Sequence, residues 1–479
     1  MSNARVFRSA GLIVVARVLA IPVSILVNAV SARVLGAGAF GVLYQAMTFS
    51  SLVFLFVEWG QPNVLMARVA THNAAAGELL GSGLACRAVA AVIAGCLVPL
   101  ACWVAGYHRQ FVLVLSLTML TATFATLAGA CQDTLRGFER AHLAAGSYLG
   151  WQLLSAAIVV PTLLLGGGLY GLLIAQAATA AAGVVFLLKM LPSLQVPRLS
   201  MRTDTMKDLL RSGRPFLVFG LVLMLQPAID AAMLSKLAAP QAMGWYGAAR
   251  KLVGALTFPA SALIVALYPT LCRLHMESME DFRSSAAQAL YVVAMAVVPL
   301  ALGCALFPEI GIALFGRQSY GQAIGDLRLL AVYVFLVYFS MPIGSCLVAA
   351  GRQYAWTVVQ AGCVIVSLVL DPPLIHWSQA RWGNGGLGVC VAAVVSEILV
   401  VSGGTALLPA GILAKVPRAK IGLVLAAALA MVAVAMALRQ VNEILRASLA
   451  VLAYALCLQL SGAFDLFKLR SLLGSRTAG

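Results

Sequence analysis

Four cationic side chains lie inside long apolar stretches of the sequence: Arg17, Arg87, Arg250 and Lys251. An ionisable residue in a membrane-spanning segment generally faces the protein interior or a water-filled cavity, where it marks the path of an ion or a polar substrate. Guanidinium and ammonium groups in such a cavity bind anionic groups, phosphate above all. These four residues are therefore our candidate substrate-binding cations.

The alternative is that each cation snorkels, so that its long side chain reaches the nearer membrane interface. Arg17 lies about 12 Å into its predicted helix, and Arg250 lies about 9 Å from the end of its own. These depths favour the cavity for both residues. Arg87 lies close to the start of its predicted span, which favours snorkelling. Since neighbouring residues of a helix point about 100° apart, one of Arg250 and Lys251 can face the cavity while the other packs or snorkels.

Acidic residues in the apolar stretches are candidates for ion coupling or gating. Asp230 lies at a depth like that of Arg250, so we expect an ion pair, either as a tie between helices or as a switch that proton entry breaks. Glu397, near the middle of its stretch, is either an ion-coupling residue or a protonated acid bonded to a neighbouring helix. Arg33 is predicted to lie on an outer loop as a topology or gate residue. Pro227 is the predicted hinge of the helix that carries Asp230.

Other chemistries have little support in the sequence. The ten cysteines lie mostly in apolar runs without a CxxC motif, and the five histidines have no metal-ligand spacing. A phosphate-binding GxxxxGK(S/T) motif is absent. No paired aspartates are found on a predicted soluble face, and the longest predicted connection is on the inner side, whereas a polymerase would be expected to carry a large outer loop. We therefore expect no catalytic residue, no metal and no cofactor, and we predict that the protein is not an enzyme.

The elements that position these side chains are membrane-spanning helices. Of 479 residues, 62% are hydrophobic and only 10% are charged, whereas a soluble domain carries about 25% charged residues. The net charge of +16 does not indicate nucleic-acid binding, because Lys and Arg punctuate apolar runs instead of forming a basic stripe. Apolar stretches of about 20 residues predict an all-α integral membrane protein with about fourteen transmembrane helices, at 9–30, 40–59, 84–105, 111–131, 146–165, 169–189, 216–236, 244–272, 286–307, 327–350, 354–375, 386–406, 421–438 and 448–462.

Two similar segments predict an internal repeat. The segment LGAGAFGVLYQA begins at Leu35 and LAAPQAMGWYGA begins at Leu237, and they open the second and the eighth predicted helices. This spacing predicts two six-helix lobes related by a pseudo-two-fold axis along the membrane normal, followed by two C-terminal helices. Alternatively, Gly-aromatic turns are simply common at membrane interfaces.

The predicted organisation has four parts. An N-terminal lobe covers residues 1–190, a cytoplasmic amphipathic connector covers 191–215, a C-terminal lobe covers 216–410, and the last two helices with a tail cover 411–479. Within the connector, 205–214 can form an amphipathic helix on the inner leaflet. Lys and Arg are more numerous on the loops that share a side with the N-terminus, which places both termini in the cytoplasm.

Three stretches carry a family resemblance. They are SARVLGAGAFGVLYQAMTFSSLVFLFVEWGQPNVLMARVA from Ser31, IDAAMLSKLAAPQAMGWYGAARKLVGALTFPASALIVALYPTL from Ile229 and ALFGRQSYGQAIGDLRLLAVY from Ala313. They resemble the polysaccharide exporter branch (Wzx-like O-antigen flippases) of the multidrug/oligosaccharidyl-lipid/polysaccharide (MOP) superfamily. The resemblance runs from the first to about the twelfth helix.

The resemblance implies an alternating-access carrier in the bacterial inner membrane. Its cargo would be an oligosaccharide repeat unit on undecaprenyl pyrophosphate, flipped from the cytoplasmic to the periplasmic leaflet for O-antigen, capsule or exopolysaccharide assembly. Further implied partners are membrane lipids, a polymerase and chain-length proteins of the same pathway, and a proton as coupling ion. The alternatives are an ion-coupled multidrug exporter or a lipid II flippase of the same superfamily.

Overall fold

The computed structural model describes residues 3–192 and 197–462. It leaves out the side chains of residues 3–15 and of Arg17, Phe219, Leu223, Val265 and Ala266. In the described residues the regular structure is entirely helical, which confirms the predicted all-α fold. The reason is physical: a backbone that crosses hydrocarbon must bond its N–H and C=O groups internally, and a helix does so within one segment.

The chain divides into two compact units, each of which is discontinuous in sequence. The first consists of residues 1–251, 318–320 and 367–389. Its helices include α1 (Asn3–Glu58), α2 (Gln61–Thr71), α3 (Ala76–Val104), α4 (Arg109–Gly137), α5 (Ala141–Leu164), α6 (Gly168–Met190) and α7 (Thr203–Leu237), with the starts of α8 (Pro240–Glu277) and α14 (Gly386–Leu407) and the later part of α13 (Gln353–Trp382).

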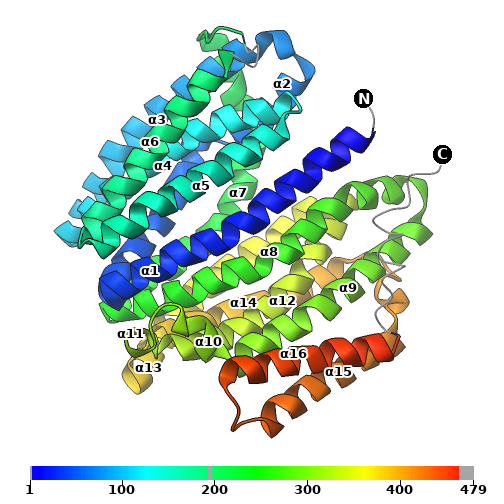
Figure 1. The fold of residues 1–479 in the computed structure, drawn as a ribbon. Helices are drawn as coiled ribbons and strands as arrows, with labels where there is room; N and C mark the ends of the chain where they lie inside the picture. Colours follow the sequence, from blue (N-terminus) through cyan, green and yellow to red (C-terminus); the bar gives the residue numbers. More distant parts are fainter. Residues whose placement is uncertain (1–2, 193–196, 463–479) are drawn as a thin grey trace. The chain divides into compact units, whose positions relative to one another are not determined.

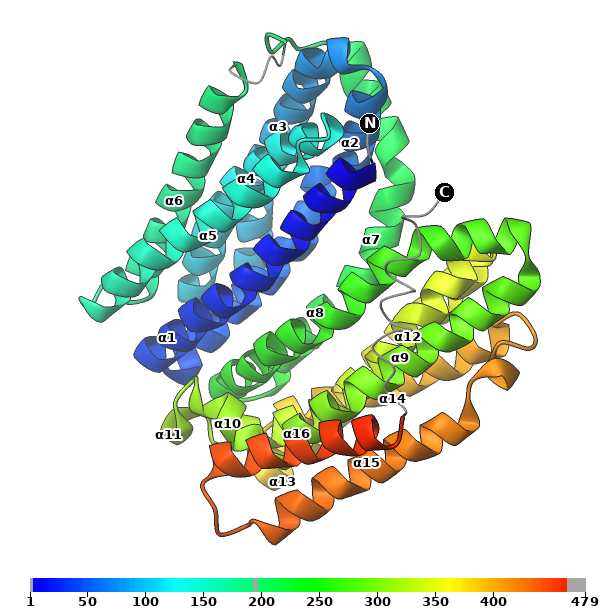
Figure 2. The same ribbon diagram turned by 45° about the vertical axis from the view of Figure 1, so that its right-hand side comes forward.

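The second unit contains the remaining parts of α8, α13 and α14. Its other helices are α9 (Met279–Leu306), α10 (Pro308–Ala313), α12 (Ala323–Ala349), α15 (Arg418–Ala437) and α16 (Glu443–Leu460). Within it, α9 packs against α12 and against the hairpin of α15 and α16, as both views show (Figures 1 and 2). In the first unit, α1 runs beside α4 and α5. The four-part organisation predicted above stays a prediction.

The number of membrane crossings follows from helix length. Twelve helical segments of the described chain are long and apolar enough to cross a membrane, and the bent α7 is a thirteenth. The first of these, Val18–Thr71, has 54 residues, or about 81 Å at 1.5 Å per residue, more than twice the roughly 30 Å hydrocarbon thickness. Non-helical backbone at Gly36, with φ 74°, divides α1 into two helices. This segment therefore supplies two crossings, as the sequence predicted.

Helix α7 is longer than the predicted span 216–236 because it begins at Thr203 and includes the predicted amphipathic stretch. It bends by 45° between Thr203–Val222 and Met224–Leu237. Pro227 accounts for the position of this bend, since a proline deprives the carbonyl four residues earlier of its hydrogen bond. Movement of Pro227 as a hinge stays a prediction.

The first half of α7 is held against α2 and α3. Leu209 is fully buried in a cluster with Leu65 and Leu80, and Arg68 forms an ion pair with Asp208. The Trp59 indole N–H donates to the Leu210 carbonyl at 3.0 Å. These contacts hold the part of the predicted connector that lies in α7 against α2, α3 and Trp59.

Close backbone contact at Gly213 gives a stability prediction. A Cβ at Gly213 would lie 2.0 Å from the Trp59 carbonyl oxygen, so we expect Gly213→Ala to push α7 away from the break between α1 and α2. Overpacking of this kind costs about 1–3 kcal/mol, and the variant should unfold at a lower temperature in detergent. Gly95→Ala is the control, because its Cβ would meet nothing within 4 Å. Equal melting temperatures would contradict this account of the contact.

Candidate functional site

A buried polar cluster in the first unit centres on Asp230 of α7, whose side chain is 1% exposed. The Tyr246 hydroxyl donates to Asp230 Oδ2 at 3.2 Å, and the Ser367 hydroxyl donates to Oδ1 at 3.3 Å. Arg250 Nη2 lies 3.9 Å from Oδ2. The ion pair between Asp230 and Arg250 that the sequence predicted is thus confirmed, with α8 and α13 supplying its partners.

A second carboxylate completes what we call the Asp230 cluster: Asp230, Tyr246, Arg250, Ser367 and Asp371. Asp371 follows Ser367 by one turn of α13, is fully buried, and interacts electrostatically with Asp230. Neither of its carboxylate oxygens has a hydrogen-bond donor in the described part of the chain. Pro372 and Pro373 come directly after it, so the helix ladder is loosened beside this acid.

The charges of the Asp230 cluster do not balance when both acids are ionised. Two buried carboxylates then face one guanidinium, and an uncompensated buried charge is costly. One additional positive charge, carried by a proton or a small cation, would neutralise the pair. The arrangement can therefore hold one additional positive charge between the two carboxylates.

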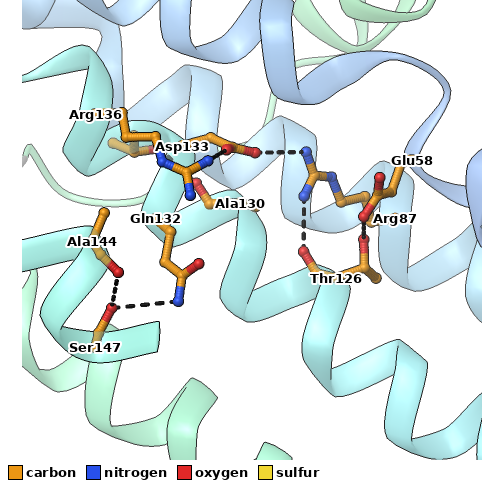
Figure 3. Close-up of polar contacts among 10 residues, drawn as sticks. Glu58, Arg87, Thr126, Ala130, Gln132, Asp133, Arg136, Ala144 and Ser147 are labelled. Carbon is orange, nitrogen blue, oxygen red and sulfur yellow. Dashed lines mark hydrogen bonds and ion pairs between the residues drawn. The ribbon is translucent and has the colours of Figure 1, made fainter. Parts of the chain in front are cut away.

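A second polar group, the Arg87 cluster, lies at the junction of α1, α2, α3 and α4. It consists of Gln61 together with Glu58, Arg87, Thr126, Asp133 and Arg136, which Figure 3 shows. Arg87 donates from Nη1 to the Thr126 carbonyl at 2.8 Å and from Nε to Gln61 Oε1 at 3.4 Å. Its Nη2 lies 3.5 Å from Asp133 Oδ2.

The remaining members of this cluster form further hydrogen bonds within it. Asp133 Oδ1 accepts from Arg136 Nη1 at 2.9 Å, and the Thr126 hydroxyl donates to Glu58 Oε1 at 3.0 Å. The Arg87 side chain is 0% exposed, so the snorkelling interpretation of this residue is wrong. Its use as a substrate-binding cation stays a prediction.

The other predicted site residues fall in different places. Lys251 lies half-buried with Nζ 3.9 Å from the Met47 sulfur. Arg33 is exposed on α1 shortly before the break at Gly36, so its predicted place on a loop is wrong, because the helix continues up to that glycine. In the second unit, the Ser340 hydroxyl donates to the Glu397 carboxylate, which is the bond to a neighbouring helix that one interpretation expected. The Arg17 side chain lies outside the described residues.

Reasoning from the sequence missed three important residues. Asp371 and Ser367 complete the Asp230 cluster, and Asp133 is the partner of Arg87. Each aspartate could have been found by the criterion that selected Asp230, because each lies in a predicted transmembrane helix or at its end.

The structure resembles those of membrane transporters. It superposes on the structure titled "Lipid II flippase MurJ, inward closed conformation" with a TM-score of 0.73 and 12% identity, covering 94% of this chain and 98% of that one. For an inward-facing multidrug resistance MATE family transporter of the MOP superfamily, the TM-score is 0.62 at 16% identity, with 81% and 95% of the chains covered.

A third similar structure is a MOP superfamily transporter from Pyrococcus furiosus, with a TM-score of 0.61, 16% identity, and 85% and 97% coverage. The chain therefore has the fold of the MOP transporters, a fold of carriers and flippases. Its sequence matches the family described as "Polysaccharide biosynthesis protein" over residues 6–275. The chain belongs to this family. A comparison with curated proteins finds no matching sequence.

Proposed function

We propose that this protein is a flippase that moves oligosaccharide repeat units linked to undecaprenyl pyrophosphate from the cytoplasmic to the periplasmic leaflet of the bacterial inner membrane. The observation that carries the proposal is the match to the polysaccharide biosynthesis family over more than half of the chain. The products would serve O-antigen, capsule or exopolysaccharide assembly, with a polymerase and chain-length proteins as partners. Both termini would be cytoplasmic, in keeping with the distribution of Lys and Arg.

The mechanism that we propose is alternating access through a cationic central cavity. Arg250, Arg17, Lys251 and Arg87 would supply the positive charge for the diphosphate, which cannot cross about 30 Å of hydrocarbon uncompensated. Arg250 supports this best, because its side chain is 12% exposed rather than fully enclosed and already has an anionic partner. A diphosphate could compete with Asp230 for this guanidinium.

The Asp230 cluster would couple transport to an ion gradient. When the diphosphate binds Arg250, the carboxylates of Asp230 and Asp371 no longer have this guanidinium beside them. The uptake of a proton by one of them then becomes more favourable. Release of the cargo would return Arg250 to Asp230 and expel the proton. Glu397 and Arg33 are further candidates for coupling or gating, by their position in the second unit and near the break at Gly36 respectively.

A lipid II flippase is the alternative with a specific observation in its favour, namely the TM-score of 0.73 to such a protein over 94% of this chain. A multidrug exporter would need a cavity for cationic drugs, which the predicted set of cations does not favour.

Deletion of the gene tests the function directly. We expect the deletion strain to lose its surface polysaccharide and to accumulate lipid-linked repeat units on the cytoplasmic side, and the intact gene to restore the polysaccharide. An Arg250→Ala or Arg17→Ala gene should fail to restore it although the protein is inserted at normal levels, as measured by immunoblot of membranes.

Arg418→Ala is the control, because Arg418 is exposed at the start of α15 in the second unit and is not one of the predicted cations. Undiminished polysaccharide in the deletion strain would overturn the proposed function. Arrested peptidoglycan synthesis with normal surface polysaccharide would instead assign lipid II as the cargo. Full activity of both arginine variants would contradict the assignment of these two residues to cargo binding, but it would not contradict the proposed function.

A further inference from the structure

A cavity of about 700 Å³ lies between α4, α5 and α6 of the first unit. Its volume is within the range of roughly 300–1,000 Å³ that is usual for pockets that hold small ligands. Small residues create the space, above all Gly146 and Gly150 of α5 and Gly183 of α6. The helices that carry the Asp230 cluster do not line it, so the proposed transport mechanism leaves this cavity unexplained.

The two ends of the cavity differ in polarity. Gln132, His142 and Ser147 line the end where α4 finishes and α5 begins, whereas Ala125, Leu154 and Ala180 line the deeper end. His142 and Leu154 are about 18 Å apart along α5 at 1.5 Å per residue, a little more than half of the hydrocarbon thickness of roughly 30 Å. A cavity of this length and polarity matches a lipid of a single leaflet, with its chain along the helices.

Basic residues surround the polar end. Arg140 lies in the turn that leads from α4 to α5, and Lys189 is exposed next to Met190, which lines the cavity. Arg136, in the last turn of α4, is paired with Asp133. The acid Asp133 is buried within the Arg87 cluster, so Glu139 is the exposed acid of this turn. The excess positive charge favours an anionic headgroup over a zwitterionic one.

A residue of the cavity wall carries a buried donor without an acceptor in the described part of the chain. Trp151 lines the wall, and its indole N–H has no hydrogen-bond partner in the described part of the chain. A buried N–H group without a partner is costly.

We propose that this cavity binds an anionic glycerophospholipid as a resident lipid, with an acyl chain along α5 and the phosphate near Arg140 and Lys189. The proposed lipid is not the cargo, and the cavity is lined by none of the helices of the Asp230 cluster. On the topology given above, the bound lipid belongs to the cytoplasmic leaflet.

Photolabelling in vesicles tests the proposal. The purified protein is placed in vesicles of phosphatidylethanolamine and phosphatidylglycerol that contain a trace of phosphatidylglycerol with a diazirine in its acyl chain, and the labelled peptides are mapped by mass spectrometry. The same experiment is done with a phosphatidylcholine probe. We expect the anionic probe to label α5 and α6 about fivefold more than the zwitterionic probe, in keeping with the attraction of one basic residue for an anionic lipid.

Variants make the test specific to the cavity. A Cβ at Gly150 or Gly146 meets nothing within 4 Å, so Gly150→Leu fills the space without a backbone clash and should reduce the labelling to the level of the phosphatidylcholine probe. Gly146→Leu is a second filling variant should the first express poorly. Gly95→Leu on α3, which is equally open, is the matched control and should label like the natural protein. Lys189→Gln should reduce only the preference for the anionic probe.

Three results would overturn the proposal. Equal labelling by the two probes would mean that only bulk lipid contacts these helices. Unchanged labelling in both filling variants would place the lipid elsewhere. Displacement of the probe by an equimolar polyprenyl diphosphate would assign the cavity to the cargo instead. None of these readouts requires transport, so the proposed function can fail without affecting this test.

Discussion

Asp230→Asn is expected to abolish transport driven by a pH gradient. The substitution keeps the size of the side chain but removes the charge that holds Arg250, and it presents an amide group to the hydroxyl donors of Tyr246 and Ser367. Breaking a buried ion pair costs about 3–5 kcal/mol, equivalent to more than about a hundredfold in an equilibrium. The measurement is the flipping of a lipid-linked oligosaccharide in proteoliposomes, followed by its accessibility to an external lectin.

Asp371→Asn should behave differently at the same site. Asp371 accepts no hydrogen bond from the described residues, and its neutralisation leaves the charges of Asp230 and Arg250 balanced. We expect this variant to fold and to flip cargo down a concentration gradient, but to lose the acceleration by a pH gradient. Asp204→Asn, on the exposed start of α7 with a side chain 83% exposed, is the control and should transport like the natural protein. Normal pH-gradient acceleration in Asp371→Asn would exclude the acid pair as the coupling site.

Much of the fold was predictable because hydrocarbon imposes a simple rule on the sequence. Apolar stretches of about 20 residues gave the positions of the crossings, and the first long helix is interrupted at Gly36, between two predicted spans. The start of α7 was not predictable from hydrophobicity. Its first half packs Leu209 against α2 and α3, and such packing depends on residues distant in sequence.

The candidate site was predictable only in part for the same reason. Equal depths of Asp230 and Arg250 in consecutive helices indicated their pairing. Asp371 joins them from a helix more than a hundred residues further along the chain, and depth alone does not show which helices are neighbours. Arg87 was misplaced because α3 begins at Ala76, whereas hydrophobicity placed its start at Leu84. Arg87 therefore lies several turns inside the helix, too deep to snorkel.

Arg87→Met is expected to destabilise the protein strongly. It removes the charge that faces Asp133 and the donors to Gln61 and the Thr126 carbonyl, while the length of the side chain is nearly kept. Loss of one partner of a buried ion pair costs about 3–5 kcal/mol. The variant should therefore give less protein in the membrane and a lower midpoint of thermal unfolding in detergent.

The double variant Arg87→Met with Asp133→Leu separates a structural role from a role in binding. Removing both members of a buried ion pair is often neutral, and Arg136, whose side chain is 36% exposed, can turn to water when Asp133 is absent. The double variant should therefore unfold at a higher temperature than either single variant. If the double variant folds and flips cargo normally, the Arg87 cluster has a structural role only, namely to hold the helices together. A double variant that folds but cannot flip cargo would instead retain Arg87 among the cations that the diphosphate meets.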